Sequence, residues 1–459
     1  MKVFKKLVRE DNFLSLSGNL VIAVLGIAGF ALLARSWSIG IFGEWVLFIT
    51  GGSFVEMFRF GITNTGLIRF LSGADENERI KLIGSNALIG LGATLLIALI
   101  LVSCYTVFND TISSSGYHLF FKWYPVLAVL NLPWNNALVV LQAGREYGKM
   151  LVIKALKSGL FFIIILVHFF FMEMTLNQVV IGLLVVNAMT SLLSMVLGWD
   201  GTKYITNASV ATNKTLLNFG KYTTFTLIGS NLLRSADTLI ISLSHMGSAA
   251  VALYSIPLKL TELQQIPLRS FVATAFPKMS KASVQGNVKE VRNLFYTYSG
   301  ALTYLFVGMS LFTFVFAEYL VLFLSGEQYL IVNPETGFNV VDIVRVFSVY
   351  GLLLPIDRMT GVGLDSINKP NINAIKVFVM VAANIIGDFV AIFVFKSLLL
   401  VAVASIVFTL IGIWMGMYFL NKELNLSYKS IFSNGIGFYK GLLNKVTGRR
   451  QLVSNNQVN

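Results

Sequence analysis

Cysteine, histidine and charged residues are all scarce in this chain of 459 residues, and each shortage excludes a class of protein. The single cysteine, Cys104, excludes an internal disulfide. The only histidines, His118, His168 and His245, are too scattered to predict a metal-binding cluster. Charged residues make up 12 % of the chain, whereas soluble domains contain about 25 %. The composition therefore excludes an ordinary soluble protein.

Apolar residues are abundant instead, at 56 % of the chain, and they occur in runs long enough to cross a membrane. We predict an all-α polytopic membrane protein with about twelve transmembrane helices. The predicted spans are residues 13–34, 40–62, 83–105, 119–141, 150–171, 177–198, 217–242, 249–275, 296–324, 341–364, 373–395 and 398–420.

The distribution of basic residues predicts the orientation of the chain. With the N-terminus inside, most of the 35 lysines and arginines fall in inner loops and span mouths, Lys376 among them. The outer loops hold only Arg35, Lys122 and Lys396. Because lysine and arginine concentrate on the cytoplasmic side, both termini are expected inside. This asymmetry also explains much of the +13 net charge, so nucleic acid is not an expected partner.

A weak internal repeat suggests the domain organisation. It sets Trp45 over Tyr254 and Arg69 over Lys278, so the first two spans correspond to the seventh and eighth. Halves of six spans each are parallel repeats, related by an axis along the membrane normal. We therefore expect an N-terminal six-helix bundle at 1–210, a C-terminal six-helix bundle at 211–420 and a basic cytoplasmic tail at 421–459.

Several ionisable residues lie inside the predicted spans, where a charge at the bilayer centre costs about 3 kcal/mol on insertion scales. Such residues are expected to face a water-filled cavity. The cations that we predict to bind an anionic cargo are Arg59, Lys154, Lys157, Arg234, Lys259 and Arg269. The acids that we predict to pair with them or to couple an ion are Glu56, Asp237, Glu262 and Asp388.

Structural roles compete with these functional interpretations. Three of the pairs are spaced i, i+3 on one helix face and neutralise each other for insertion in that alternative: Glu56–Arg59, Arg234–Asp237 and Lys259–Glu262. Long side chains near the inner side, Arg269 and Lys154, can also reach the interface. Aromatic residues at span ends serve either sugar stacking or interface anchoring: Tyr117, Trp123, Tyr124 and Trp134. A structural cluster is the alternative for Asp357, Arg358 and Asp365.

Five stretches carry a resemblance to a known family. They are LLARSWSIGIFGEW from residue 32, FGITNTGLIRFLS from residue 60, RSADTLIIS from residue 234, AAVALYSIPLKL from residue 249 and DSINKPNINAIKVFVMVAANIIGD from residue 365. Over residues 10–420 the chain resembles polysaccharide repeat-unit flippases, those of O-antigen, capsule or exopolysaccharide. These Wzx-like proteins belong to the multidrug/oligosaccharidyl-lipid/polysaccharide (MOP) exporter superfamily. Asp237, Tyr254 and Lys259 stand at that family's recurring positions.

The resemblance implies two six-helix bundles around a central cavity in the bacterial cytoplasmic (inner) membrane. It implies flipping of undecaprenyl-pyrophosphate-linked oligosaccharide from the inner to the outer leaflet by alternating access. Membrane lipids, a polysaccharide polymerase and a chain-length regulator are the implied partners. Relatives that flip the peptidoglycan precursor carry an Arg and an Asp in the first span. Residues 13–34 contain neither, so that cargo is not favoured.

The alternatives are a cation-coupled multidrug exporter of the same superfamily, a flippase for another lipid-linked precursor and a polymerase-type glycan enzyme. A drug exporter would need membrane carboxylates without the excess of cations. A polymerase would need a large outer loop. No enzyme is predicted, because Gly144–Met150 (GREYGKM) lacks the spacing and the Ser/Thr of a phosphate-binding loop. No cofactor is expected, and movement is either passive or driven by a Na⁺ or H⁺ gradient.

Overall fold

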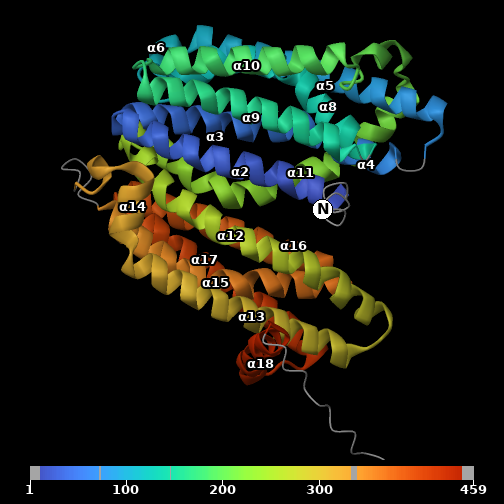
Figure 1. The fold of residues 1–459 in the computed structure, drawn as a ribbon, viewed down its shortest axis with the longest axis vertical. Helices are drawn as coiled ribbons and strands as arrows, with labels where there is room; N and C mark the ends of the chain where they lie inside the picture. Colours follow the sequence, from blue (N-terminus) through green and yellow to red (C-terminus); the bar gives the residue numbers. More distant parts are fainter. Residues whose placement is uncertain (1–10, 72–73, 145, 332–338, 447–459) are drawn as a thin grey trace, which may run out of the picture. The chain divides into compact units, whose positions relative to one another are not determined.

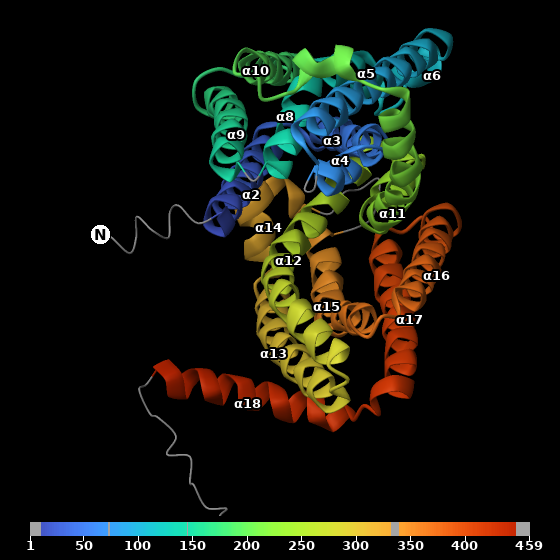
Figure 2. The same cartoon turned by 90° about the vertical axis from the view of Figure 1, so that its right-hand side faces the viewer.

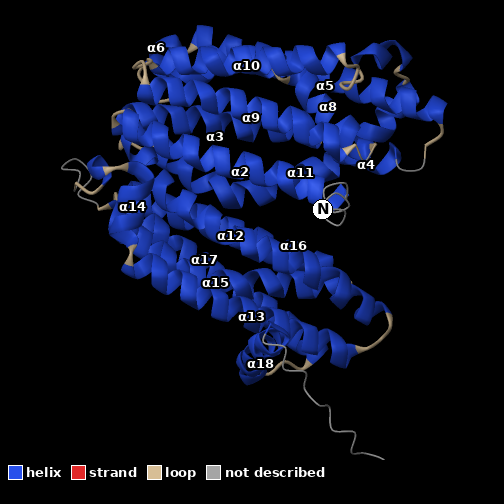
Figure 3. Ribbon diagram, viewed as in Figure 1, coloured by secondary structure: helices blue, strands red, loops and turns tan. Residues whose placement is uncertain are grey.

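The fold is known from a computed structural model, which describes residues 11–71, 74–144, 146–331 and 339–446. Every regular element within these ranges is a helix, and Figure 3 shows no strand among them. The predicted all-α polytopic class is therefore confirmed. In the part of the chain that the structure describes, seven helices are long and apolar enough to cross a membrane, and a bent pair makes an eighth candidate. Each predicted span overlaps a helix, while the count of twelve membrane crossings stays a prediction.

The chain divides into two compact units, which we describe separately. Unit 1 comprises residues 1–255 and 322–331, and unit 2 comprises residues 256–321 and 332–459. One boundary between them falls inside a single long helix, α12 (Gly247–Val284). The bundle limits expected from the sequence, 1–210 and 211–420, stay a prediction.

Unit 1 contains α2 to α11. Their bounds are α2 Asp11–Ser36, α3 Ile39–Gly61, α4 Asn64–Leu71, α5 Glu76–Val107, α6 Asn109–Ser113, α7 His118–Leu130, α8 Leu132–Ala143, α9 Tyr147–Phe170, α10 Leu176–Val196, the 3₁₀ helix η1 Thr202–Asn207 and α11 Val210–Ser242. The helix α9 packs between α2 and α10, and α11 packs on α3 (Figure 1). Glycine, which has no side chain, allows two backbones to come into close contact. A Cβ on Gly84 of α5 would lie 2.0 Å from the carbonyl oxygen of Tyr204.

Local sequence explains where these helices begin and break. The hydroxyl of Thr175 and the side chain of Gln178 cap each other's backbone N–H groups at the start of α10. Between α7 and α8 the helix axis bends by 48°. Pro133 lies in the first turn of α8 and has no N–H to continue the hydrogen-bond ladder of α7. The predicted span 119–141 is therefore formed by two helices with a break between them.

Unit 2 contains the rest of α12 and the following helices. Their bounds are α13 Val288–Val315, α14 Ala317–Ser325 (which unit 2 shares with unit 1), α15 Val340–Ser366, α16 Pro370–Phe389, the π-helix η3 Val390–Val394, α17 Leu398–Leu424 and α18 Tyr428–Val446; the 3₁₀ helix η2 Glu327–Tyr329 belongs to unit 1. A continuous apolar core joins α12, α13, α15 and α17 around Phe295, Phe306, Met359 and Leu420, which are buried. Because each helix contributes an apolar face to this core, packing rather than helix propensity stabilises the bundle.

The region expected as a basic tail forms a helix over much of its length. Figure 2 shows α18 running along the end of the bundle, where it packs against α13. A Cβ on Gly300 of α13 would lie 2.0 Å from the carbonyl oxygen of Ile431, so glycine permits this close crossing. The hydroxyl of Tyr439 donates to the carbonyl oxygen of Ala301 at 2.9 Å. The tail is thus anchored to unit 2 by contacts from Ile431 to Tyr439.

Candidate functional site

A buried arginine organises a polar cluster at the break between α7 and α8. Arg59 comes from α3 and is 0 % exposed. Its guanidinium donates to the hydroxyl of Thr94 in α5 at 2.9 and 3.2 Å. It also donates to Oδ1 of Asn131 at 3.1 Å and to the carbonyl oxygen of Ala128 at 2.5 Å. Arg59 therefore ties α3 and α5 to the last turn of α7 and to the break that follows.

Asn131 connects this arginine to an acid. While its Oδ1 accepts from Arg59, its Nδ2 donates to Oε1 of Glu56 at 2.5 Å. Glu56 lies 4.0 Å from the guanidinium, and its side chain is 34 % exposed. The predicted Glu56–Arg59 pair is thus formed loosely and is bridged by an amide. Glu56 keeps access to the surroundings, whereas the donors of Arg59 bind protein groups.

A lysine of α9 packs on a tryptophan just after the break. The ammonium of Lys157 in α9 lies 3.6 Å from the ring centroid of Trp134 in α8, a cation–π contact. Glu56 is near enough to act electrostatically on Lys157. The indole N–H of Trp134 donates to the carbonyl oxygen of Ile153 at 3.4 Å, which fixes the ring against α9. Lys154, one turn earlier, is half-buried.

Two of the predicted cations, Arg59 and Lys157, are therefore brought together around one broken helix. Sequence analysis missed Thr94 and Asn131, which hold the arginine. Asn131 had a usable signal, because it precedes Pro133 inside an apolar run and so stands where a span breaks. Tyr124, predicted for sugar stacking or anchoring, is 1 % exposed and lies beside Arg59 in the packed interior.

Asp237 has a partner on the next helix of unit 1. The hydroxyl of Tyr254 donates to Oδ2 of Asp237 at 2.8 Å, and both side chains are buried. Tyr254 is the residue that the internal repeat aligns with Trp45. The side chain of Arg234 lies outside the described residues, so the predicted Arg234–Asp237 pair is not part of this account.

The inner part of α12 carries the remaining predicted cations. Lys259 donates to Oε2 of Glu262 at 2.9 Å, so this i, i+3 pair is formed. The two side chains are 25 % and 43 % exposed. Arg269 is exposed and donates to the amide oxygen of Gln265 at 3.4 Å. These cations are thus more accessible than Arg59, and their predicted role in binding cargo stays a prediction.

A second buried cation lies in unit 2, at a position that the sequence analysis places at an inner span mouth. Lys376 of α16 is 2 % exposed and lies 2.7 Å from the carboxylate of Asp357 in α15. It also donates to the backbone oxygen of Asp357 and to the hydroxyl of Thr360, both at 3.0 Å. Lys376 can be buried as an ammonium because it finds three acceptors on one turn of α15.

Glycines on α17 make room for this ion pair. A Cβ on Gly412 would lie 2.9 Å from Oδ1 of Asp357, and one on Gly416 would lie 2.4 Å from the hydroxyl of Thr360. Two glycines one turn apart thus form the wall of the site. Nearby, Nδ2 of Asn373 donates to both carboxylate oxygens of Asp365 at 3.0 Å.

Asp388 lies near the end of α16 and is 0 % exposed. Its Oδ2 accepts from Nδ2 of Asn384, one turn earlier, at 3.0 Å. The π-helix η3 begins two residues later. Such π-turns inside helices are frequent at functional sites. The fully buried acid is chemically suited to the ion-coupling role predicted for it, which stays a prediction.

Comparison with known proteins identifies the fold and the family. Among solved structures, the lipid II flippase MurJ in an inward closed conformation superposes with a TM-score of 0.69 at 14 % identity, covering 95 % of this chain and 93 % of MurJ. An inward-facing multidrug resistance MATE family transporter of the MOP superfamily gives 0.68 at 13 % identity, covering 89 % and 98 %. A MOP superfamily transporter from Pyrococcus furiosus gives 0.56 at 13 % identity, covering 92 % and 98 %.

At these identities the structural likeness shows the fold, which is that of MOP superfamily transporters. No curated protein matches the sequence. The model of the family described as "Polysaccharide biosynthesis protein" matches residues 8–283, more than half of the chain. The resemblance seen in the sequence motifs is thereby confirmed. The chain is a multi-pass membrane protein that belongs to the polysaccharide biosynthesis protein family and has the MOP fold.

Proposed function

We propose that the protein is a flippase for undecaprenyl-pyrophosphate-linked oligosaccharide repeat units, moving them from the inner to the outer leaflet of a bacterial cytoplasmic membrane. The observation that carries the proposal is the group formed by Lys157, Trp134 and Glu56 at the break between α7 and α8. Transporter sites are typically built on broken helices. A cation suits the pyrophosphate, and an indole ring offers a flat apolar face for a sugar.

The two cations at the break take different roles in this proposal. The donors of Arg59 are engaged by Thr94, Asn131 and Ala128, so we assign it the positioning of the broken helix. Lys157 is partly buried, and its ammonium, which lies over the ring of Trp134, carries three hydrogens of which not all can face the ring. We assign Lys157 the contact with the pyrophosphate, and Lys154 a supporting contact one turn away.

Glu56 links binding to the shape of the helix. Glu56 acts electrostatically on Lys157 and accepts from Asn131. An incoming pyrophosphate repels this carboxylate and replaces it in balancing the charge of the lysine. Movement of Glu56 removes one of the two bonds that hold Asn131, so the α7–α8 break is free to change its angle. We propose this as the local step of alternating access.

In unit 2, Lys259 is proposed to meet the cargo in a similar way. Its partner Glu262 is 43 % exposed, so an anion can displace it without leaving the acid in an apolar site. Arg269 lies further along α12 and is exposed. The buried carboxylates Asp237 and Asp388 are proposed to couple movement to a Na⁺ or H⁺ gradient. Polysaccharide polymerase and chain-length regulator are the proposed partners downstream.

A cation-coupled multidrug exporter is the second candidate. The fully buried carboxylate of Asp388 favours it, because cation coupling needs membrane acids. The neighbouring MATE transporters share the fold with this chain. The exposed cations of α12 disfavour it, since the cargo of such exporters is often cationic.

The test is genetic and chemical. A strain that lacks the protein should accumulate lipid-linked glycan on the cytoplasmic face and lose surface polysaccharide. Complementation with Lys157→Gln should fail at normal protein level. The matched control is Lys149→Gln, on the same helix, whose exposed lysine pairs with Glu146 and should complement fully. Intact surface glycan in the null strain, together with raised sensitivity to cationic drugs, would show the exporter instead.

A further inference from the structure

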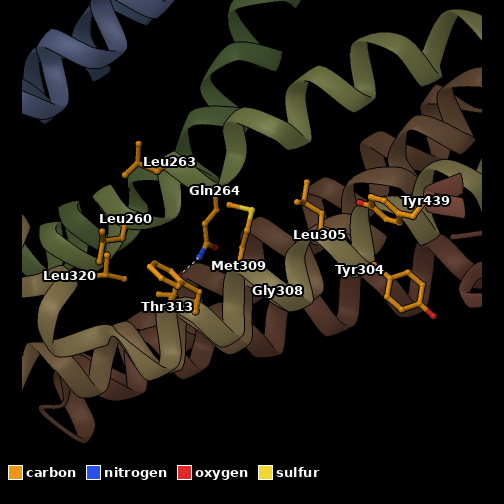
Figure 4. Close-up of a pocket in the computed structure, with 11 residues that line it drawn as sticks. Leu260, Leu263, Gln264, Tyr304, Leu305, Gly308, Met309, Thr313, Leu320 and Tyr439 are labelled. Atoms are coloured by element: carbon orange, nitrogen blue, oxygen red, sulfur yellow. Dashed lines mark hydrogen bonds between the residues drawn. The ribbon is translucent and has the colours of Figure 1, made fainter. Parts of the chain in front are cut away.

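An apolar groove runs along unit 2 between α12 and α13, with α14 at one end and α18 at the other. It has a volume of about 570 Å³. Figure 4 shows Leu260 and Leu320 at one end, Leu263 and Met309 in the middle, and two tyrosines at the opposite end. The lining residues of α13 extend from Tyr304 to Thr313, so the groove is about 14 Å long at 1.5 Å per residue. Its length and apolar walls suit a single hydrocarbon chain.

A glycine leaves the groove open in its middle. Gly308 of α13 lines the groove, and a Cβ built on it would meet nothing within 4 Å. The space over this residue is therefore unfilled by protein. Nε2 of Gln264 donates to the hydroxyl of Thr313 at 3.1 Å, while Oε1 of Gln264 is buried without a hydrogen-bond partner among the described residues. Most of the other lining residues are apolar, so the walls suit an apolar occupant.

The tyrosine end of the groove is closed by α18. Tyr439 of α18 lines the groove beside Tyr304, and the ring of Phe432 lies 6.5 Å from that of Tyr304. Successive residues of α18 are rotated by about 100° around the helix axis. Its apolar residues cover a wider part of the helix surface than the part that packs on α13. An apolar row on the helix therefore remains exposed. Its members are Tyr428 at 67 %, Phe432 at 48 %, Ile436 at 44 % and Leu443 at 61 %.

The charged residues beside this row indicate what kind of surface covers it. Lys429 and Lys440 are exposed and lie along the edge of the row on the helical wheel. From Leu424 to the last residue the sequence contains no Asp or Glu. An apolar face bordered by lysines is the pattern of a helix that lies on an anionic membrane surface. With the termini inside, as predicted, this surface is that of the inner leaflet.

We propose that the groove binds one anionic phospholipid of the inner leaflet. One acyl chain lies along α13 over Gly308, and the phosphate meets the lysines of α18. Binding would couple the position of α18 to α12, the helix that carries Lys259. This lipid site does not depend on the proposed cargo, so a failure to flip glycan and a failure to bind phospholipid are separate results.

The test uses the purified full-length protein in detergent. Native mass spectrometry measures retained lipid, and the shift of the melting temperature measures binding of added phosphatidylglycerol or phosphatidylcholine. The wild type should retain one phosphatidylglycerol and be stabilised by it more than by phosphatidylcholine. Gly308→Leu should fill the groove and abolish retention. The control Gly159→Leu, on α9, places the same side chain where a Cβ also meets nothing within 4 Å and should retain the lipid.

A second pair of variants tests the headgroup and leaves the groove intact. Lys429→Gln with Lys440→Gln should weaken phosphatidylglycerol binding by about fivefold for each lysine, since each is worth about 1 kcal/mol near an anionic surface. Lys203→Gln with Lys214→Gln, both exposed in unit 1, should leave binding unchanged. Equal binding by wild type and Gly308→Leu would overturn the site. Equal binding of the two phospholipids, or displacement by equimolar undecaprenyl phosphate, would overturn its assignment to an anionic phospholipid.

Discussion

Among the described side chains, each unit buries one cation, and the two units do so by different means. Arg59 of unit 1 binds neutral oxygens of three residues, with its nearest carboxylate 4.0 Å away. Lys376 of unit 2 makes a direct ion pair at 2.7 Å. The fork of an arginine reaches several helices at once, whereas lysine is a point charge that one acid can neutralise. The first arrangement joins helices around a break, and the second joins two continuous helices.

This difference has a functional meaning in the proposed mechanism. The acid near Arg59 is partly exposed and is bound through the amide of Asn131. It can therefore move away while the guanidinium keeps its hydrogen bonds to neutral oxygens. The acid beside Lys376 cannot leave without stranding a buried ammonium. We therefore expect the α7–α8 break to change during transport and the α15–α16 contact to stay fixed.

The largest expected effect follows from breaking the ion pair of unit 2. Asp357→Asn leaves Lys376 buried without its counter-charge and should lower the free energy of unfolding by about 3–5 kcal/mol. The melting temperature of the purified protein measures this loss. The double change Asp357→Leu with Lys376→Met removes both charges and should recover most of the stability. A double variant as unstable as the single one would contradict the pair's assignment as a static contact.

Removal of the buried arginine should have the next largest effect. Arg59→Leu leaves the buried oxygens of Thr94, Asn131 and Ala128 without their donor, at a cost of about 1–3 kcal/mol. Arg59→Lys should restore part of the stability, because an ammonium cannot reach all three groups in a fork. Melting temperatures and surface glycan should fall together in this series. A fully active Arg59→Leu would remove its positioning role.

Packing around the second cation is tested by adding one methyl group. Gly416→Ala places a Cβ 2.4 Å from the hydroxyl of Thr360, so the ion-pair site must shift. Such overpacking costs about 1–3 kcal/mol. The control Gly159→Ala adds the same methyl group where nothing lies within 4 Å. Similar melting temperatures for the two variants would show that α17 does not press on the site.

The smallest expected effect on stability is that of Glu56→Gln. Because Glu56 is 34 % exposed and only 4.0 Å from Arg59, its charge should contribute less than about 1 kcal/mol to folding. Transport should nevertheless fall, since the proposed exchange at Lys157 needs the carboxylate. A large loss of stability would show that the Glu56–Arg59 pair holds the fold together as the Asp357–Lys376 pair does. The proposed difference between the two units would then be wrong.

Helix positions were predictable because the signals are local. An apolar run of span length and a capping residue act within one segment, so each expected span overlaps a helix. The Glu56–Arg59 and Lys259–Glu262 pairs were predictable for the same reason, since i, i+3 neighbours share a helix face. The bent α7–α8 pair was expected as one span, although Pro133 marks the break.

The sequence by itself determined the membrane class, the helices and the pairs within one helix, because each depends on residues one or two turns apart. Tertiary structure decided which helix meets which. It placed Asn131 and Thr94 around Arg59, Tyr254 against Asp237, and Lys376 inside unit 2. These contacts join helices far apart in the chain and depend on how each helix is rotated about its axis, which packing alone sets.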